Sequence, residues 1–139
     1  MARDMKRKSL PETLMGFAQL LAKRSTCSRL QVGCIVASSD GHRIYSYGYN
    51  GNARKFPNKC DSSEPGKCGC IHAEANALIK VSASDPDKVL YCTTLPCKMC
   101  AKMIVNSGAS KVYFATEYRL SEGRKVLTKA GVKLQKLRA

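Results

Sequence analysis

The sequence predicts an α/β fold in which helices pack against a partly parallel sheet. Three observations support this: apolar strand-like segments alternate with helix-like segments, Gly and Pro separate them, and an early pair of strands is joined by a tight turn. The length of 139 residues suits one domain, residues 1–139, with a single core. Neither an internal repeat nor a low-complexity segment interrupts it.

The first half of the chain is predicted to hold one helix and a β-hairpin. Apolar residues at helical spacing indicate a helix over residues 10–24. Residues 31–37 are typical of a buried strand, and the turn at residues 38–41 leads into a second strand at residues 43–49. Residues 50–69 lack periodicity, and a loop of this length is unusual unless it is functional or pinned, for example by a metal.

The second half alternates helices with apolar strands, which indicates parallel neighbours in the sheet. Two of the helices end just before a glycine, a common helix stop. The expected elements are helix 72–82, strand 88–93, helix 97–107, strand 111–115, helix 120–130 and strand 132–136.

The chain is strongly basic, with a formal net charge of +14. Residues 1–30 carry seven basic and two acidic side chains and residues 111–139 carry eight and two, so these ends hold +11 of that charge. Such a field favours polyanionic partners or phosphorylated substrates, and a plain solvated basic surface is the alternative.

Composition also excludes some classes of protein. No apolar stretch reaches the roughly 18 residues that would span a bilayer, and the basic N-terminus is not followed by an apolar signal core. We therefore expect a soluble protein of the cytoplasm with no membrane partner. The missing signal also argues against reading the eight cysteines as a secreted disulfide scaffold.

Two short segments carry the strongest chemical signal. His72-Ala73-Glu74 is followed, 22 residues later, by Pro96-Cys97-Lys98-Met99-Cys100. This order matches the H-x-E and P-C-x-x-C signature of zinc-dependent base deaminases. A catalytic zinc takes three protein ligands and leaves one position open, and the expected ligands are His72, Cys97 and Cys100.

Glu74 is the predicted catalytic residue, which moves protons while water replaces an amino group on a base. The backbone amides of Ala73 and Cys97 are candidates for stabilising the intermediate. Each ligand segment opens a predicted helix, where the helix dipole favours thiolates and a carboxylate. A Cys-x-x-Cys pair alone is also typical of a structural knuckle or a redox pair, but neither would need Glu74.

The other six cysteines fall into two groups. Cys34 and Cys92 lie in apolar, strand-like runs and are expected to be small buried hydrophobes. Four cysteines remain, which is the number that a closed structural zinc site requires, and four free thiols in a reducing cell are the alternative. These four are Cys27, Cys60, Cys68 and Cys70.

Several segments together resemble the cytidine deaminase-like superfamily, and more narrowly the deoxycytidylate (dCMP) deaminases, from about Leu14 to Val132. The segments that carry the resemblance are Arg24-Ser25-Thr26-Cys27 ahead of Gln31-Val32-Gly33, Gly48-Tyr49-Asn50-Gly51, His72-Ala73-Glu74-Ala75-Asn76-Ala77 and Pro96-Cys97-Lys98-Met99-Cys100-Ala101-Lys102.

The resemblance implies a three-layer α/β/α fold with a mixed five-stranded sheet, a catalytic zinc and hydrolysis of dCMP to dUMP and ammonia, which supplies dUMP for thymidylate synthesis. It also implies a homo-hexamer regulated by dCTP and dTTP. Some relatives, phage enzymes among them, hold a second zinc in the long loop. The matching positions here are the four cysteines left over above.

The same resemblance points to substrate contacts. It implies that Asn50 hydrogen-bonds the sugar or base, although Asn-Gly is also a common hairpin turn. Arg24, Arg29 and Lys55 are candidate phosphate ligands, and Tyr118 is a candidate for lining the pocket. The chain departs from the family at residues 52–56, where many relatives place a Pro and a Gly.

A nucleic-acid deaminase is the competing prediction, acting on a tRNA adenosine or on a cytosine in single-stranded DNA. The +14 charge supports it, because neutralising phosphates drives such binding. Aromatic residues make up only 6% of the chain and Trp is absent, so platforms for stacking extruded bases are scarce. A non-catalytic zinc module, the third class, would have no use for Glu74.

Overall fold

The computed structural model describes residues 5–138 and has the expected mixed α/β architecture. Four helices and five strands occur within these residues. In chain order they are α1 (Leu10–Ala22), β1 (Gly33–Ser38), β2 (Ile44–Tyr49), α2 (Ala73–Leu78), β3 (Lys88–Thr94), α3 (Lys98–Ser107), β4 (Lys111–Thr116), α4 (Glu122–Lys129) and β5 (Lys133–Lys136). Residues 1–4, part of the basic N-terminus, and residue 139 lie outside the described residues.

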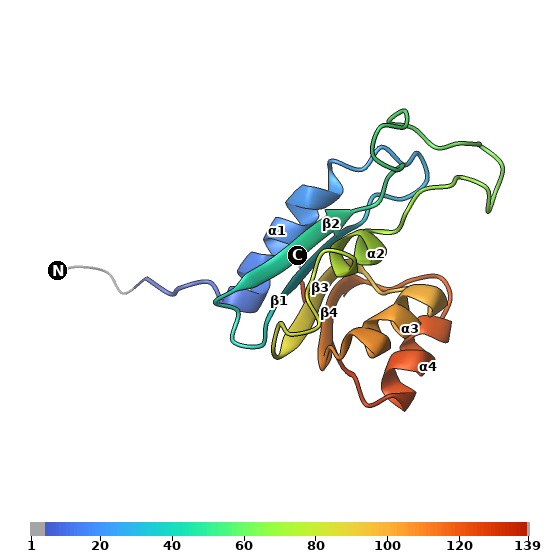
Figure 1. Ribbon diagram of the computed structural model, residues 1–139. Helices are drawn as coiled ribbons and strands as arrows, with labels where there is room; N and C mark the ends of the chain where they lie inside the picture. The colour runs from blue at the N-terminus through green and yellow to red at the C-terminus, as the bar shows by residue number, and fades with distance from the viewer. Residues whose placement is uncertain (1–4, 139) are drawn as a thin grey trace.

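The sheet has the strand order β2-β1-β3-β4-β5 (Figure 1). Its first half is antiparallel, with β1 pairing to β2 and β3, and its second half is parallel, with β4 pairing to β3 and β5. The carboxyl ends of β3 and β4 therefore lie at one edge, and a helix starts after each of them. The predicted mixed five-stranded sheet is confirmed.

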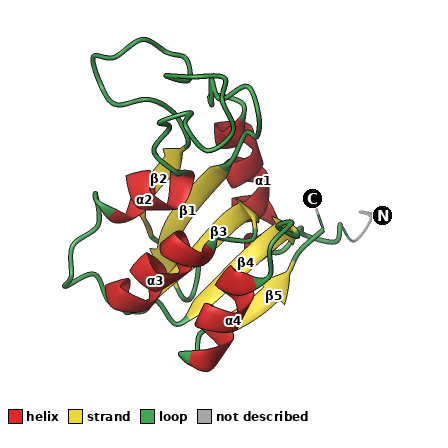
Figure 2. Ribbon diagram, turned by 90° about the vertical axis from the view of Figure 1, so that its right-hand side faces the viewer, coloured by secondary structure: helices red, strands yellow, loops and turns green. Residues whose placement is uncertain are grey.

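Helices cover both faces of the sheet and produce three layers (Figure 2). Helix α1 packs Met15 and Ala18 against Ile35 and Tyr91 on one face. Helices α2, α3 and α4 cover the other face, around a core that includes the fully buried Leu90 of β3. Burying these apolar surfaces stabilises the layered arrangement.

Each predicted element is present, and the largest difference is at α2. The predicted helix 72–82 ends its α-helical part at Leu78. The chain then tightens, with Val81 N–H donating to Leu78 O at 3.3 Å. Ser82 N–H donates to the Asp85 carboxylate at 2.9 Å, and this turn prevents further helix.

Two glycines let helices approach the backbone beside the later site. A Cβ on Gly48 of β2 would lie 2.6 Å from Ala73 O, so no larger residue permits this contact between β2 and α2. A Cβ on Gly123 of α4 would lie 2.0 Å from Pro96 O. The starts of α2 and α3 are therefore held by direct backbone packing.

The long segment between β2 and α2 is a loop, as predicted, and it projects from one end of the sheet (Figure 1). Gly51 and Ile71 close its base through two backbone hydrogen bonds, of 3.1 and 2.7 Å. Of the helices in residues 5–138, none has the length and apolar character needed to cross a membrane.

Candidate active site

The predicted zinc ligands meet where two helices begin. His72 is the N-cap of α2 and Cys97 is the N-cap of α3, and neither side chain forms a capping hydrogen bond. Their donor atoms therefore remain available for another partner. Cys100 lies one turn into α3, on its buried side.

The three donor atoms are close enough to share one metal ion. All lie within 4.8 Å of one another, with His72 Nδ1 at 3.3 Å from Cys100 Sγ and 3.5 Å from Cys97 Sγ. A tetrahedral zinc with ordinary bond lengths separates nitrogen and sulfur ligands by about 3.5 Å. One imidazole and two thiols in this arrangement fit zinc, and the exposed His72 leaves a side open to solvent.

Glu74 lies in the first turn of α2 and is only 4% exposed. Burial raises the pKa of its carboxyl to about 7, and a backbone hydrogen bond at Glu74 and then the nearby His72 offset part of that rise. A carboxyl group with such a pKa can both accept and release a proton near neutral pH.

The two cysteines of this cluster differ in acidity. The Cys100 thiol and then the His72 imidazole stabilise the thiolate of Cys97 and lower its pKa to about 4, against the effect of burial. The Cys97 contact and burial raise the pKa of Cys100. The pKa of His72 is raised, first by its contact with Cys97.

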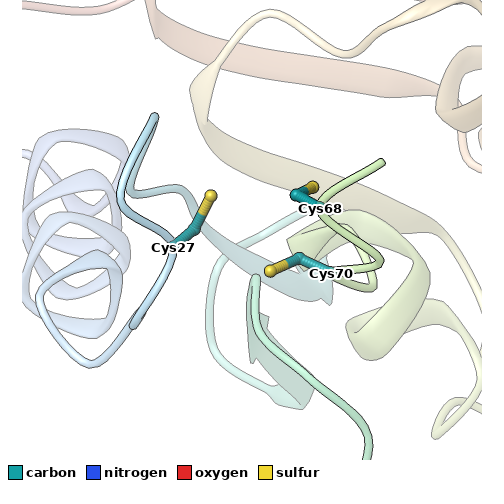
Figure 3. Close-up of side chains that lie close together, drawn as sticks. All are labelled: Cys27, Cys68 and Cys70. Carbon is teal, nitrogen blue, oxygen red and sulfur yellow. The ribbon is translucent and has the colours of Figure 1, made fainter. Parts of the chain in front are cut away.

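A second cluster joins the segment after α1 to the long loop (Figure 3). The sulfur atoms of Cys27, Cys68 and Cys70 all lie within 4.8 Å of one another. Cys60 is outside that group of three, but its sulfur is 3.8 Å from Cys27 and 3.6 Å from Cys70. Four thiolates around a tetrahedral zinc are about 3.8 Å apart, so this donor set fits zinc as well.

Hydrogen bonds within the loop support the second cluster. Asp61 N–H donates to Cys68 O at 2.7 Å, and the Asn52 amide donates to the Asp61 carboxylate at 2.8 Å. Gly69 separates two of the cysteines with φ +72°, and a Cβ there would lie 2.0 Å from Asp61 Oδ2. Only glycine fits this position without displacing Asp61.

Asn50 directly follows β2 and is buried. Its Oδ1 accepts from Val32 N–H at 2.8 Å and its Nδ2 donates to Leu30 O at 2.7 Å. The side chain therefore ties the segment after α1 to the end of β2. One amide hydrogen is left for a further partner.

The other predicted substrate residues differ in their burial and in their contacts. The Arg24 guanidinium lies 5.3 Å from the centre of the ring of Tyr49, the residue before Asn50, and its contact with Tyr49 raises the pKa of Arg24. Tyr118 is half-buried in the loop after β4, two residues beyond Thr116, whose carbonyl accepts from Leu95 N–H at 2.8 Å.

Two candidates have no contact with the first cluster in this structure. Arg29 is exposed in the segment after α1. Lys55 is exposed at a turn of the long loop, with φ +75°.

Cys34 and Cys92 are completely buried opposite each other on β1 and β3, with sulfurs 3.7 Å apart, so their predicted burial is confirmed.

Sequence reasoning gave no role to Asn76, whose side chain connects the end of β2 to the segment just before His72 in this structure. Its Nδ2 donates to Tyr49 O at 2.9 Å and to Ile71 O at 3.4 Å. These carbonyls belong to the residues just before Asn50 and His72. The sequence offered two signals, its place in the segment from His72 to Ala77 that resembles the dCMP deaminases and its position four residues after His72, one helical turn along.

With this geometry in place, comparisons with known proteins are informative. Residues 8–116 match the family described as the cytidine and deoxycytidylate deaminase zinc-binding region. A deoxycytidylate deaminase of Saccharomyces cerevisiae is 36% identical over 139 residues, which cover 91% of this chain and 44% of that enzyme. This chain thus spans less than half the length of the yeast relative.

Phage proteins match over their full length. The deoxycytidylate deaminase of Mycobacterium phage D29 is 32% identical, with 81% of this chain and 99% of that protein covered. The crystal structure of dCMP deaminase from the cyanophage S-TIM5, in complex with dCMP and dUMP, has a TM-score of 0.82 and 35% identity, and it covers 96% of this chain and 100% of that one.

Proposed function

This chain belongs to the cytidine and deoxycytidylate deaminase zinc-binding family, and we propose that it hydrolyses dCMP to dUMP and ammonia. The observation that carries this proposal is the buried carboxyl of Glu74 beside a cluster of one imidazole and two thiols with zinc spacing. A metal site that was only structural would have no need of a buried acid at its side.

His72, Cys97 and Cys100 would hold the catalytic zinc. When bound, zinc would supply hydroxide at neutral pH by lowering the pKa of water to about 7. Glu74 accepts one proton of the attacking water and delivers it to the ring nitrogen N3 of cytosine, while the water oxygen forms a bond to C4. Glu74 then carries the second proton of the water to the amino group on C4, and the C4–N bond breaks to release ammonia.

Other groups hold the nucleotide and the developing charge. The N–H groups of Ala73 and Cys97 lie at helix starts, where the backbone has no partner within its own helix, and they stabilise the intermediate. Asn50 offers its remaining amide hydrogen to the nucleoside. Arg24, whose guanidinium lies over the Tyr49 ring, contacts the phosphate, and Tyr118 lines the pocket.

The second cluster, Cys27, Cys60, Cys68 and Cys70, would hold a structural zinc that fixes the long loop. The proposal also includes one catalytic domain over residues 1–139, a homo-hexamer, regulation by dCTP and dTTP, and a cytoplasmic location. The phage relative solved with dCMP and dUMP supports the substrate assignment.

Ammonia release on a substrate panel tests the proposal directly. The panel contains dCMP, dCTP, cytidine, deoxycytidine, single-stranded DNA and tRNA, with the Glu74→Gln variant as the blank. We expect kcat/KM for dCMP to exceed that for deoxycytidine at least ~100-fold, since each charge-assisted phosphate contact contributes about 1.5–3 kcal/mol. Efficient deamination of DNA or tRNA with dCMP left untouched would replace this proposal with the nucleic-acid alternative.

A further inference from the structure

The positive charge is concentrated in the last third of the described chain. Residues 98–138 carry ten basic and two acidic side chains, a net charge of +8 out of +14. The two carboxylates already have partners, because Glu117 pairs with Arg124 and Lys136, and Glu122 pairs with Lys98. Little negative charge is left to neutralise the remaining lysines.

The lysines of α3 and α4 form one surface, the α3–α4 lysine face, made of Lys98, Lys102, Lys125 and Lys129. All four side chains are exposed. The two helices lie side by side over the same face of the sheet (Figure 2). Lys102 and Lys129 line one open groove of about 530 Å³, together with Val105 and Val126.

This arrangement is unfavourable for the chain alone. Each helix carries two lysines four residues apart, and like charges at that spacing destabilise a helix. Lys98 has Glu122 at 3.6 Å, but Lys102, Lys125 and Lys129 have no carboxylate within reach among residues 5–138. A polyanion laid across both helices would relieve this repulsion.

We propose that the α3–α4 lysine face binds a nucleic-acid duplex through its phosphates. Neither α3 nor α4 contains an aromatic residue, and Tyr113 and Phe114 of β4 are buried, so the two helices offer no stacking platform for single-stranded bases. The large exposed apolar residues nearby, Met99 and Leu120, precede or begin the helices and do not form a stripe that would enter a membrane.

Lys98 directly follows Cys97 at the start of α3, but the other three lysines of the face lie away from the site of chemistry. His72 and Cys97 lie at helix starts, whereas Lys129 is the last residue of α4 and Lys102 lies beyond the first turn of α3. The duplex is therefore a binding partner and not the deaminated substrate. Contacts to phosphates alone carry no sequence preference, so binding should be sensitive to salt and indifferent to sequence.

Fluorescence anisotropy with a short labelled DNA duplex tests this at increasing salt. Four phosphate contacts predict a slope of about −3.6 in log K against log salt concentration. The combined variant Lys102→Ala, Lys125→Ala, Lys129→Ala should reduce the slope by about 2.7 and leave dCMP turnover unchanged. A matched variant removes three exposed charges elsewhere, as Lys6→Ala, Lys8→Ala, Arg43→Ala, and should keep most of the affinity.

Three results would overturn the proposal. The first is a wild-type protein without salt-dependent duplex binding, and the second is an equal loss of affinity in both triple variants, which would trace binding to net charge alone. The third is tighter binding to vesicles of phosphatidylcholine and phosphatidylserine than to the duplex, with the same dependence on Lys102, Lys125 and Lys129. That result would assign the face to a membrane surface.

Discussion

The two sulfur-containing clusters of this protein are built in opposite ways. His72, Cys97 and Cys100 are placed by regular structure, because both segments start helices that pack on a buried sheet. Close contacts at Gly48 and Gly123 fix those helix starts. The donors therefore converge through the fold itself, and an acid, Glu74, is buried beside them.

The second cluster, which we also call the loop cluster, is not positioned by helices or strands. Its four cysteines lie in segments without helix or strand, namely Cys27 after α1 and Cys60, Cys68 and Cys70 in the long loop. The loop itself is held by the Gly51–Ile71 bridge at its base and by a few hydrogen bonds. None of these four cysteines belongs to either of the two hydrophobic clusters of the described residues, and all four are only half-buried. The comparison teaches that packed helices and strands place the donors of the first cluster, whereas loop hydrogen bonds alone place those of the second, so a metal should contribute more to the order of the second.

The largest expected effect is a loss of turnover in the Glu74→Gln variant, which tests whether the first cluster is catalytic. Glu74→Gln removes only the ability to carry a proton and keeps the shape of the buried side chain, so kcat should fall about 10²–10⁴-fold. Metal content and the unfolding temperature should stay near those of the wild type. Steady-state kinetics on dCMP with metal analysis of the same samples measures both.

Glu122→Gln is the matched control, since Glu122 is also an acid in the first turn of a helix but is exposed. It should leave kcat unchanged within about twofold, because exposed ion pairs contribute little. A Glu74→Gln enzyme that retained a tenth or more of wild-type turnover would exclude Glu74 as the proton carrier.

The sequence predicted the first cluster well because local rules place it. Apolar periodicity located the elements, and a ligand at each helix start is a short-range feature that spacing reveals. Asn76 was missed for the opposite reason. Its partners, the carbonyls of Tyr49 and Ile71, lie 27 and 5 residues away and have no side-chain signature in the sequence.

The end of α2 and the face of the sheet that each helix covers could not be predicted for the same reason, because both depend on contacts that leave no pattern in the sequence. The turn that stops α2 depends on the Asp85 side chain reaching Ser82 N–H. For the loop, the count of cysteines predicted a four-residue cluster, but the position of Cys60 relative to the other three depends on the loop path. Loop paths follow from contacts such as Asn52 to Asp61, which have no periodic pattern to reveal them.

The second prediction breaks the loop cluster alone. Cys60→Ser should lower the zinc content from about two per chain to about one, since a closed structural site needs four ligands. Limited proteolysis should then cut within residues 51–71, while the helices stay protected. Cys34→Ala, a buried cysteine outside both clusters, is the control and should keep both metals.

The effect of Cys60→Ser on catalysis should be smaller than that of Glu74→Gln. The loop ends at Cys70-Ile71-His72, so loosening it disturbs a ligand of the first cluster without removing one. We expect a rise in KM for dCMP of about 10-fold, comparable to the 10–100-fold losses seen when groups outside a ligand set change. A wild-type protein with a single zinc, and an unaltered loop in the variant, would refute a second metal site.

The smallest expected effect tests the link between the two regions. Asn76→Ala removes two hydrogen bonds, to the carbonyls that precede Asn50 and His72, and each contributes about 0.5–1.5 kcal/mol. The free energy of unfolding should therefore fall by about 1–3 kcal/mol, measured by urea denaturation. Because Asn50 and His72 would both move slightly, KM should rise several-fold while zinc content stays constant.

Asn106→Ala, at an exposed asparagine on α3, controls for the substitution itself. If Asn76→Ala lowered stability but left KM unchanged, Asn76 would hold the fold together without positioning the site.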